Sequence, residues 1–190
     1  MSKHRVVIAA GVAALVGCGR GDADRDVVRG KGLQLATLPV AERAAVYRSA
    51  LRAAFDIGPS LVLLLHPRQL PRTAGLAGGA PVPAELAAAL ESSGIVQGRC
   101  DVPDESAEGR GGRPTQAPRC EARLPGYVVR FSDVFRRPPD SVQVYVEAER
   151  FATAASGPAQ PFRFEKAYQL VGGGTSWRVA REGRVTETRD

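Results

Sequence analysis

The sequence predicts an α+β domain in which two helices pack on a curved antiparallel β-meander of about four to five strands. Two observations predict this class. Apolar residues recur at helical spacing over residues 39–57, and they alternate with polar residues from Gly126 onward. A change of period from near 3.6 to 2 indicates amphipathic helices followed by half-buried strands. Helices at one end of such a chain cover the apolar face of the sheet.

The first helix is expected over residues 39–57. Pro39 suits the first turn, because the N–H that proline lacks would have no partner there. One stripe of this helix carries the apolar residues Val40, Ala44, Tyr47, Leu51 and Phe55. Gly58-Pro59 predicts the end of the helix, since neither residue continues one well.

A short buried strand and a second helix are expected next. Residues 61–65 form an unbroken apolar run that is too short for a helix and is typical of a buried strand. After a Pro- and Gly-rich loop, the second helix begins at Pro83 and ends before Gly94. Residues 95–100 then predict a further short strand.

The C-terminal half predicts four strands with alternating apolar and polar residues. They are centred on residues 127–132, 142–149, 162–170 and 175–179, with turns at 136–140 and 172–174. Antiparallel strands of this pattern bury one face and expose the other to solvent. We expect Trp177 on the buried face.

The order of these elements is similar to known folds. A long N-terminal helix followed by a meander that ends in Thr175-Ser176-Trp177-Arg178-Val179 resembles nuclear transport factor 2-like and cystatin-like folds. Val129-Arg130-Phe131-Ser132, Val144-Tyr145-Val146 and Tyr168 also resemble the patterns of uncharacterised exported bacterial proteins. Such folds include both enzymes and binding modules, so the resemblance assigns no catalytic residue.

The first 17 residues have the composition of an export signal. Lys3-His4-Arg5 is a basic start, and residues 6–16 form an apolar core much shorter than the roughly 20 residues that cross a bilayer. Leu15-Val16-Gly17-Cys18 resembles the lipobox of bacterial lipoproteins. The resemblance implies cleavage before Cys18 and acylation of that cysteine. Several acyl chains would hold the protein stably on a membrane.

An ordinary cleaved signal and a short uncleaved anchor are the alternatives to a lipobox. The lipobox divides the chain into a signal peptide over 1–17, a lipidated cysteine with a flexible tether over 18–36, and one domain over 37–190. We expect a cell-envelope location that faces the periplasm or the exterior. Because Gly19 rather than Asp follows Cys18, lipoprotein sorting implies the outer membrane in an organism with two membranes.

The two remaining cysteines, Cys100 and Cys120, are predicted to form a disulfide. They remain as a pair in an oxidising compartment once Cys18 is assigned to lipid. A bridge that closes a loop of about 20 residues would add on the order of 3 kcal/mol of stability. A metal site or a reactive thiol is the alternative. Metal ligation normally requires more Cys and His than the mature chain holds, so neither a metal nor a cofactor is expected.

The charge pattern does not favour nucleic acid as a partner. The formal net charge is +6 at pH 7, but basic residues are interleaved with acidic ones along the chain. The basic blocks and aromatic-basic motifs of nucleic-acid modules do not occur. The expected partners are therefore the membrane, through the lipid on Cys18, and an envelope protein or a small ligand.

His66 is the one candidate for ligand binding or catalysis, because it lies where a buried strand meets a long loop. No G-x-S-x-G, H-E-x-x-H or S-x-x-K motif accompanies it, so no catalytic residue is assigned. The sequence predicts a non-catalytic envelope lipoprotein that binds a protein or a ligand. The alternatives are a hydrolase-like envelope enzyme that uses His66 and a structural or assembly accessory of the envelope.

Overall fold

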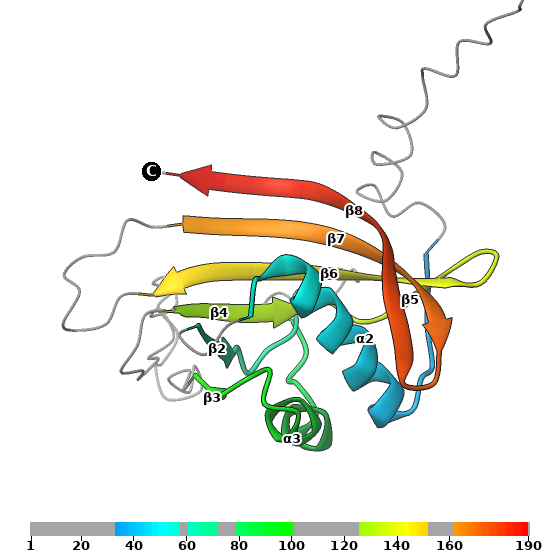
Figure 1. Ribbon diagram of the computed structural model, residues 1–190, viewed down its shortest axis with the longest axis horizontal. Coiled ribbons are helices and arrows are strands. Elements are labelled where there is room, and N and C mark those ends of the chain that lie inside the picture. The colour runs from blue at the N-terminus through cyan, green and yellow to red at the C-terminus, as the bar shows by residue number, and fades with distance from the viewer. Residues whose placement is uncertain (1–32, 58–60, 72–78, 101–125, 152–161, 190) are drawn as a thin grey trace, which may run out of the picture.

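The structure is a computed structural model that describes residues 33–57, 61–71, 79–100, 126–151 and 162–189. The helices among these described residues are α2 (Val40–Ala54) and α3 (Ala84–Ser92). The strands are β1 (Gln34–Leu35), β2 (Val62–Leu65), β3 (Gly98–Arg99), β4 (Gly126–Phe131), β5 (Phe135–Arg137), β6 (Ser141–Phe151), β7 (Phe162–Gly173) and β8 (Ser176–Arg189). These elements confirm the α+β class (Figure 1).

The predicted meander is present, but the sheet around it is larger. Strands β4, β6, β7 and β8 pair antiparallel in that order. The described strands form an eight-stranded sheet, so the expectation of four to five strands was wrong. The sheet is also mixed rather than antiparallel, because β2 pairs parallel with both β3 and β4. Both faces of β2 are covered, since Leu63 and Leu65 pack in the main core while Leu64 packs with Cys100 and Val128 on the opposite side, and this explains its apolar run.

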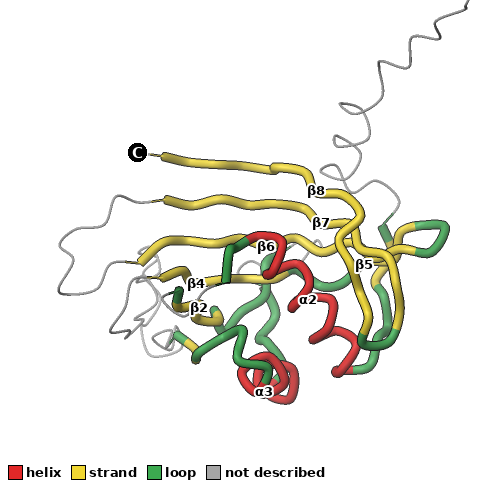
Figure 2. The backbone as a smooth tube through the Cα atoms, viewed as in Figure 1, coloured by secondary structure: helices red, strands yellow, loops and turns green. Residues whose placement is uncertain are grey.

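Strand β6 organises the sheet because it has two partners along one edge. Its first residues, Ser141 to Gln143, pair with β5, and its later residues pair with β4. The other edge of β6 pairs with β7 along most of its length. The long strands β7 and β8 bend past the N-terminal end of α2 (Figures 1 and 2).

Two short strands lie where the sequence predicted a tether and a turn. The expected turn at 136–140 begins as β5, and only Pro138 to Asp140 turn the chain, with a cis peptide bond between Pro138 and Pro139. Strand β1 lies inside the range expected as tether and pairs antiparallel with β5. Strand β8 extends from Ser176 to Arg189, well beyond the expected strand.

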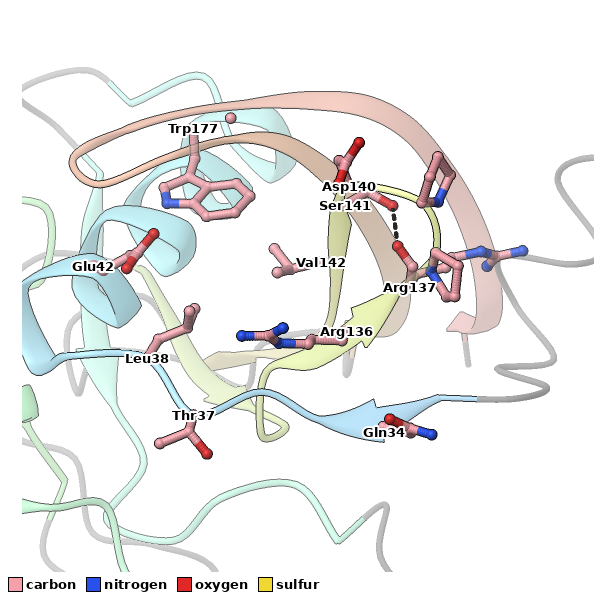
Figure 3. A pocket seen from close by; sticks show the side chains of 13 residues that line it. Gln34, Thr37, Leu38, Glu42, Arg136, Arg137, Asp140, Ser141, Val142 and Trp177 are labelled. Carbon is pink, nitrogen blue, oxygen red and sulfur yellow. Dashed lines mark hydrogen bonds between the residues drawn. The ribbon is translucent and has the colours of Figure 1, made fainter.

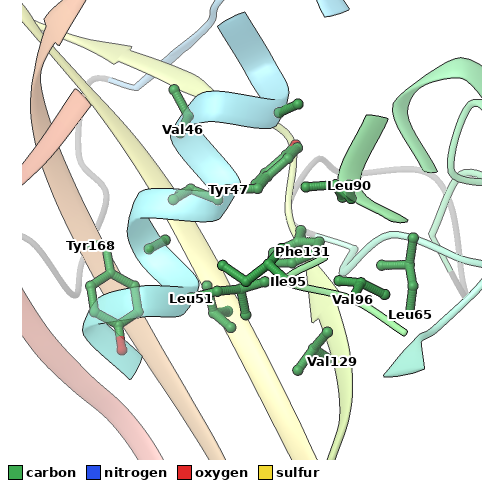
Figure 4. Close-up of a cluster of buried hydrophobic side chains, with 14 of the residues drawn as sticks. Val46, Tyr47, Leu51, Leu65, Leu90, Ile95, Val96, Val129, Phe131 and Tyr168 are labelled. Atoms are coloured by element: carbon green, nitrogen blue, oxygen red, sulfur yellow. The ribbon is translucent and has the colours of Figure 1, made fainter. Parts of the chain in front are cut away.

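The core lies between the helices and one face of the sheet, which we call the inner face. Helix α2 ends at Ala54 rather than near residue 57, and its predicted stripe faces the sheet, with Tyr47 and Leu51 fully buried. The Tyr47 ring stacks on Phe131 with 4.6 Å between ring centroids. Helix α3 adds Leu86 and Leu90 to the same core (Figure 4). Neither described helix is long and apolar enough to cross a membrane.

The opposite, outer face of the sheet differs from its predicted character. Alternation along β6 predicted that Gln143, Tyr145 and Glu147 would face solvent, yet all three are buried. Glu147 forms an ion pair with Arg163, and one of its oxygens lies 3.7 Å from Arg130 Nη1. Tyr145 packs in a small apolar cluster with Leu70, Phe135 and Ala167. The outer face of the sheet therefore also buries side chains, both apolar and charged.

Candidate functional site

A cavity of about 610 Å³ opens at the end of the sheet that carries the β7–β8 hairpin and the β5–β6 turn (Figure 3). Three parts of the fold line it: the segment from β1 into the first turn of α2, the turn between β5 and β6, and the hairpin between β7 and β8. Its volume lies within the roughly 300–1,000 Å³ of small-molecule sites. Such sites combine apolar surface with a few polar groups at defined positions.

One wall of the cavity consists of Trp177 and Glu42, and both are held by Gly174. The backbone N–H of Gly174 donates to Glu42 Oε1 at 2.8 Å. Trp177 Nε1 donates to the carbonyl oxygen of Gly174 at 3.1 Å. Gly174 has a φ of +57°, which glycine adopts without the steric cost that a Cβ would bring. The hairpin geometry thus fixes a carboxylate and an indole ring side by side.

The opposite wall carries the guanidinium of Arg136. Arg136 is opposite Val142 in the β5–β6 register and extends into the cavity (Figure 3). The side chain of the next residue, Arg137, points away, and its Nη1 donates to Gln143 Oε1 at 2.8 Å. This difference follows from the alternation of side chains along a strand. Within the described part of the chain, the Arg136 guanidinium makes no hydrogen bond or ion pair.

Apolar side chains lie between the two charged walls. Val142 is buried at the base of the cavity, and Leu38 is partly buried beside it. Trp177 is also partly buried and packs against the edge of the core, as its predicted inward position requires. The cavity therefore offers an apolar centre, a cation on one side, and a carboxylate with an aromatic ring on the other.

The structure places His66 outside this cavity. Its backbone N–H donates to the carbonyl of Val129 at 2.9 Å. Its Nδ1 lies 3.0 Å from both the backbone N and the backbone O of Arg68, so this nitrogen is engaged in either tautomer. Burial, with a further contribution from the charge of Arg130, lowers the His66 pKa to about 4. A neutral histidine with so low a pKa is a weak general base near neutral pH.

Of the predicted cysteine sites, only Cys100 lies among the described residues. Cys100 is buried, disulfide-bonded, and packed with Leu64 and Val128 on the outer face. The cysteine bonded to it is not among the described residues, which include neither Cys18 nor Cys120. The pairing of Cys100 with Cys120 and the lipidation of Cys18 stay predictions.

Sequence reasoning did not identify Glu42, Arg136 or Trp177 as site residues. Arg136 falls in the predicted turn at 136–140 and Trp177 on the predicted buried face, while Glu42 is not part of the apolar stripe of its helix. The one available signal was the charge of Arg136 beside a Pro-Pro turn, and many surface turns share that pattern. Only pairing across β5, β6 and the β7–β8 hairpin brings the three residues to one cavity.

No protein-family model, curated protein or solved structure shows a significant match to this chain. Within the described ranges, no group of three or more His, Cys, Asp or Glu side chains is arranged to hold a metal ion. The function is therefore inferred from the geometry of the cavity and from the N-terminal sequence.

Proposed function

We propose that this protein is a membrane-anchored envelope lipoprotein whose domain is a non-catalytic binding module, with its ligand site in the cavity beside Trp177. One observation carries the binding site: the Arg136 guanidinium, which has no hydrogen-bond or ion-pair partner among the described residues, faces a wall in which Trp177 and Glu42 are both held by Gly174. Groups fixed in place before a ligand arrives lose little entropy when it binds, which favours affinity. The lipobox-like sequence that ends at Cys18 supports the anchor.

The hydroxyl group of Ser141, which lines the cavity, favours binding over catalysis. Covalent catalysis by serine requires a hydroxyl hydrogen-bonded to a general base. Ser141 instead donates to the backbone carbonyl of Arg137 at 3.0 Å and accepts from Gln169 Nε2 at 2.9 Å. No histidine is among the described residues that line this cavity. These bonds hold the Ser141 hydroxyl in place without pairing it to a general base, which favours recognition of a ligand.

The anchor and the cavity are close along the chain. Gln34 and Thr37 line the cavity, and Gln34 follows Cys18 by 16 positions in the sequence. A fully extended chain of that length spans at most about 58 Å. A lipid on Cys18 would therefore keep the cavity within that distance of the membrane surface.

Trp177 is the only tryptophan of the chain, so tryptophan emission comes entirely from a residue that lines the cavity. We expect a small-molecule fraction of the host envelope to change the emission of the purified mature protein. Arg136→Ala should weaken this response, whereas Arg181→Ala, which removes an arginine that does not line the cavity, should leave it intact. If no fraction changes the Trp177 emission or the melting temperature, the binding-module proposal is wrong.

A further inference from the structure

We infer that the ligand of this cavity is a small zwitterion whose cationic group binds between Trp177 and Glu42 and whose anionic group binds Arg136. The inference rests on the proposed function, because it names the ligand class for the same cavity. It follows from the placement of opposite charges on opposite walls of one cavity, with apolar side chains between them (Figure 3).

The wall formed by Trp177 and Glu42 suits a cation. A carboxylate accepts hydrogen bonds at both oxygens, and the Gly174 N–H occupies only Oε1 of Glu42. Indole is the aromatic ring that attracts a cation most strongly through its face. Since Gly174 holds both side chains, an ammonium group that enters the cavity meets a carboxylate and an indole already in position.

The opposite wall suits an anion. A guanidinium presents five N–H donors in a planar arrangement that matches a carboxylate or a phosphate in a bidentate pair. Arg136 is exposed, and its guanidinium points into the cavity without a hydrogen-bond partner among the described residues. Asp140 also lines the cavity. Its carboxylate would repel an anion that reached the turn without an accompanying cation.

The sum of these charges selects for a ligand that carries both signs. A simple anion would gain the contact with Arg136 but would meet the carboxylates of Glu42 and Asp140. A simple cation would gain Glu42 but would meet the charge of Arg136. Only a zwitterion satisfies both walls, and like-charge contacts that exclude the wrong ligand are a general source of specificity. Val142 and Leu38 suit a short hydrocarbon segment between the two charged groups.

Matched probes that differ in one charge test this inference. Trp177 emission is titrated with alanylalanine, its N-acetyl form and its C-terminal amide, which carry both charges, the anion alone and the cation alone. A second set consists of glycerophosphocholine, glycerophosphoglycerol and choline. The two sets distinguish an amino-acid-like zwitterion from a phospholipid headgroup. In at least one set, the zwitterion should bind at least tenfold more tightly than either single-charge probe.

Two variants assign each charge to its wall. Arg136→Ala should weaken zwitterion binding at least tenfold without weakening the cation probe, which no longer meets the charge of Arg136. Glu42→Gln keeps an oxygen that accepts from Gly174, and it should weaken zwitterion binding at least tenfold without weakening the anion probe. Arg181→Ala and Glu85→Gln serve as controls, because neither residue lines the cavity. Circular dichroism confirms that each variant is folded.

The outcomes separate this inference from the proposed function. A single-charge probe that binds as tightly as its zwitterion overturns the inference, and so does either site variant that behaves as its control does. Failure of all six probes also overturns it, while a response to the envelope fraction would leave the binding-module proposal standing. Failure of both the probes and the envelope fraction would overturn the two together.

Discussion

Two buried tyrosines in the same core provide a matched test of hydrogen bonding. Tyr47 and Tyr168 both have a relative exposure of 0% and both face the helix side of the sheet. The Tyr47 hydroxyl donates to the backbone carbonyl of Ser132 at 2.8 Å. The Tyr168 hydroxyl is buried and has no hydrogen-bond partner among the described residues. Replacing each with phenylalanine removes the same atom from two different environments.

The expected effects differ in size and in sign. Tyr47→Phe leaves the carbonyl of Ser132 buried without this donor and should cost about 1–3 kcal/mol of unfolding free energy. The ring, and with it the stacking on Phe131 at 4.6 Å, is retained. Tyr168→Phe removes a polar group that gains nothing in the core, so it should be neutral or stabilise by about 1 kcal/mol.

Urea unfolding followed by circular dichroism measures both variants. Burial raises the Tyr47 pKa to about 12 and also raises that of Tyr168, so both phenols stay neutral near pH 7. Each kcal/mol should shift the melting temperature of a domain of this size by about 2–4 °C. Equal destabilisation by the two substitutions would refute the reasoning, because it would mean that the Tyr168 hydroxyl has a partner or that the Tyr47 bond contributes nothing.

Three further predictions concern the cysteines and His66. Reduction should lower the unfolding free energy by about 3 kcal/mol, and Cys120→Ser should have the same effect; a Cys120→Ser protein as stable as the wild type would refute the pairing. Cys18→Ser should move the protein from the membrane fraction to the soluble fraction, and mass spectrometry should find acyl chains on Cys18 of the wild type. Because the His66 pKa falls from its ordinary 6.5 to about 4 in the folded state, the unfolded state binds the proton more readily between these values. The contribution of neutral His66 to the free energy of unfolding is thus complete above pH 6.5 and is lost as the pH falls toward 4. The free energy of unfolding changes over this range by at most about 1.4 kcal/mol per pH unit. His66→Gln should flatten the stability profile between pH 6.5 and 5, and an unchanged slope would contradict this cause.

Local patterns in the sequence predicted the helices and the meander strands, because periodicity and stop signals act over short stretches. The apolar run of β2 predicted burial but not direction, since parallel pairing with β3 and β4 depends on residues far along the chain. The buried charge of Glu147 was missed for the same reason. Alternation assigned it to solvent, whereas Arg163 and Arg130 reach it from neighbouring strands.

The candidate site was even less visible in the sequence. The junction of a buried strand with a long loop predicted His66 as a candidate, yet its Nδ1 lies 3.0 Å from the backbone N and O of Arg68 in the structure. The residues that line the cavity are common types, and their significance comes from the direction of each side chain. In the β5–β6 register, Arg136 lies on the cavity side and Arg137 does not, a distinction that requires the β5 strand to be known.

The cavity wall is stabilised by contacts that are separate from the core, which makes the site testable without unfolding the domain. Two α2 side chains hold the β7–β8 hairpin: Glu42 accepts from Gly174, and Ser49 Oγ donates to the backbone carbonyl of Trp177 at 2.7 Å. Because Ser49 holds the hairpin independently, the loss of charge in Glu42→Gln should change ligand binding and leave the hairpin in place. Trp177 is only partly buried, so Trp177→Ala should lower the free energy of unfolding by less than the ~3–5 kcal/mol that is typical of truncating a fully buried aromatic residue. The Arg136 side chain is exposed and contributes little to folding, so its orientation toward the cavity supports the proposed ligand site.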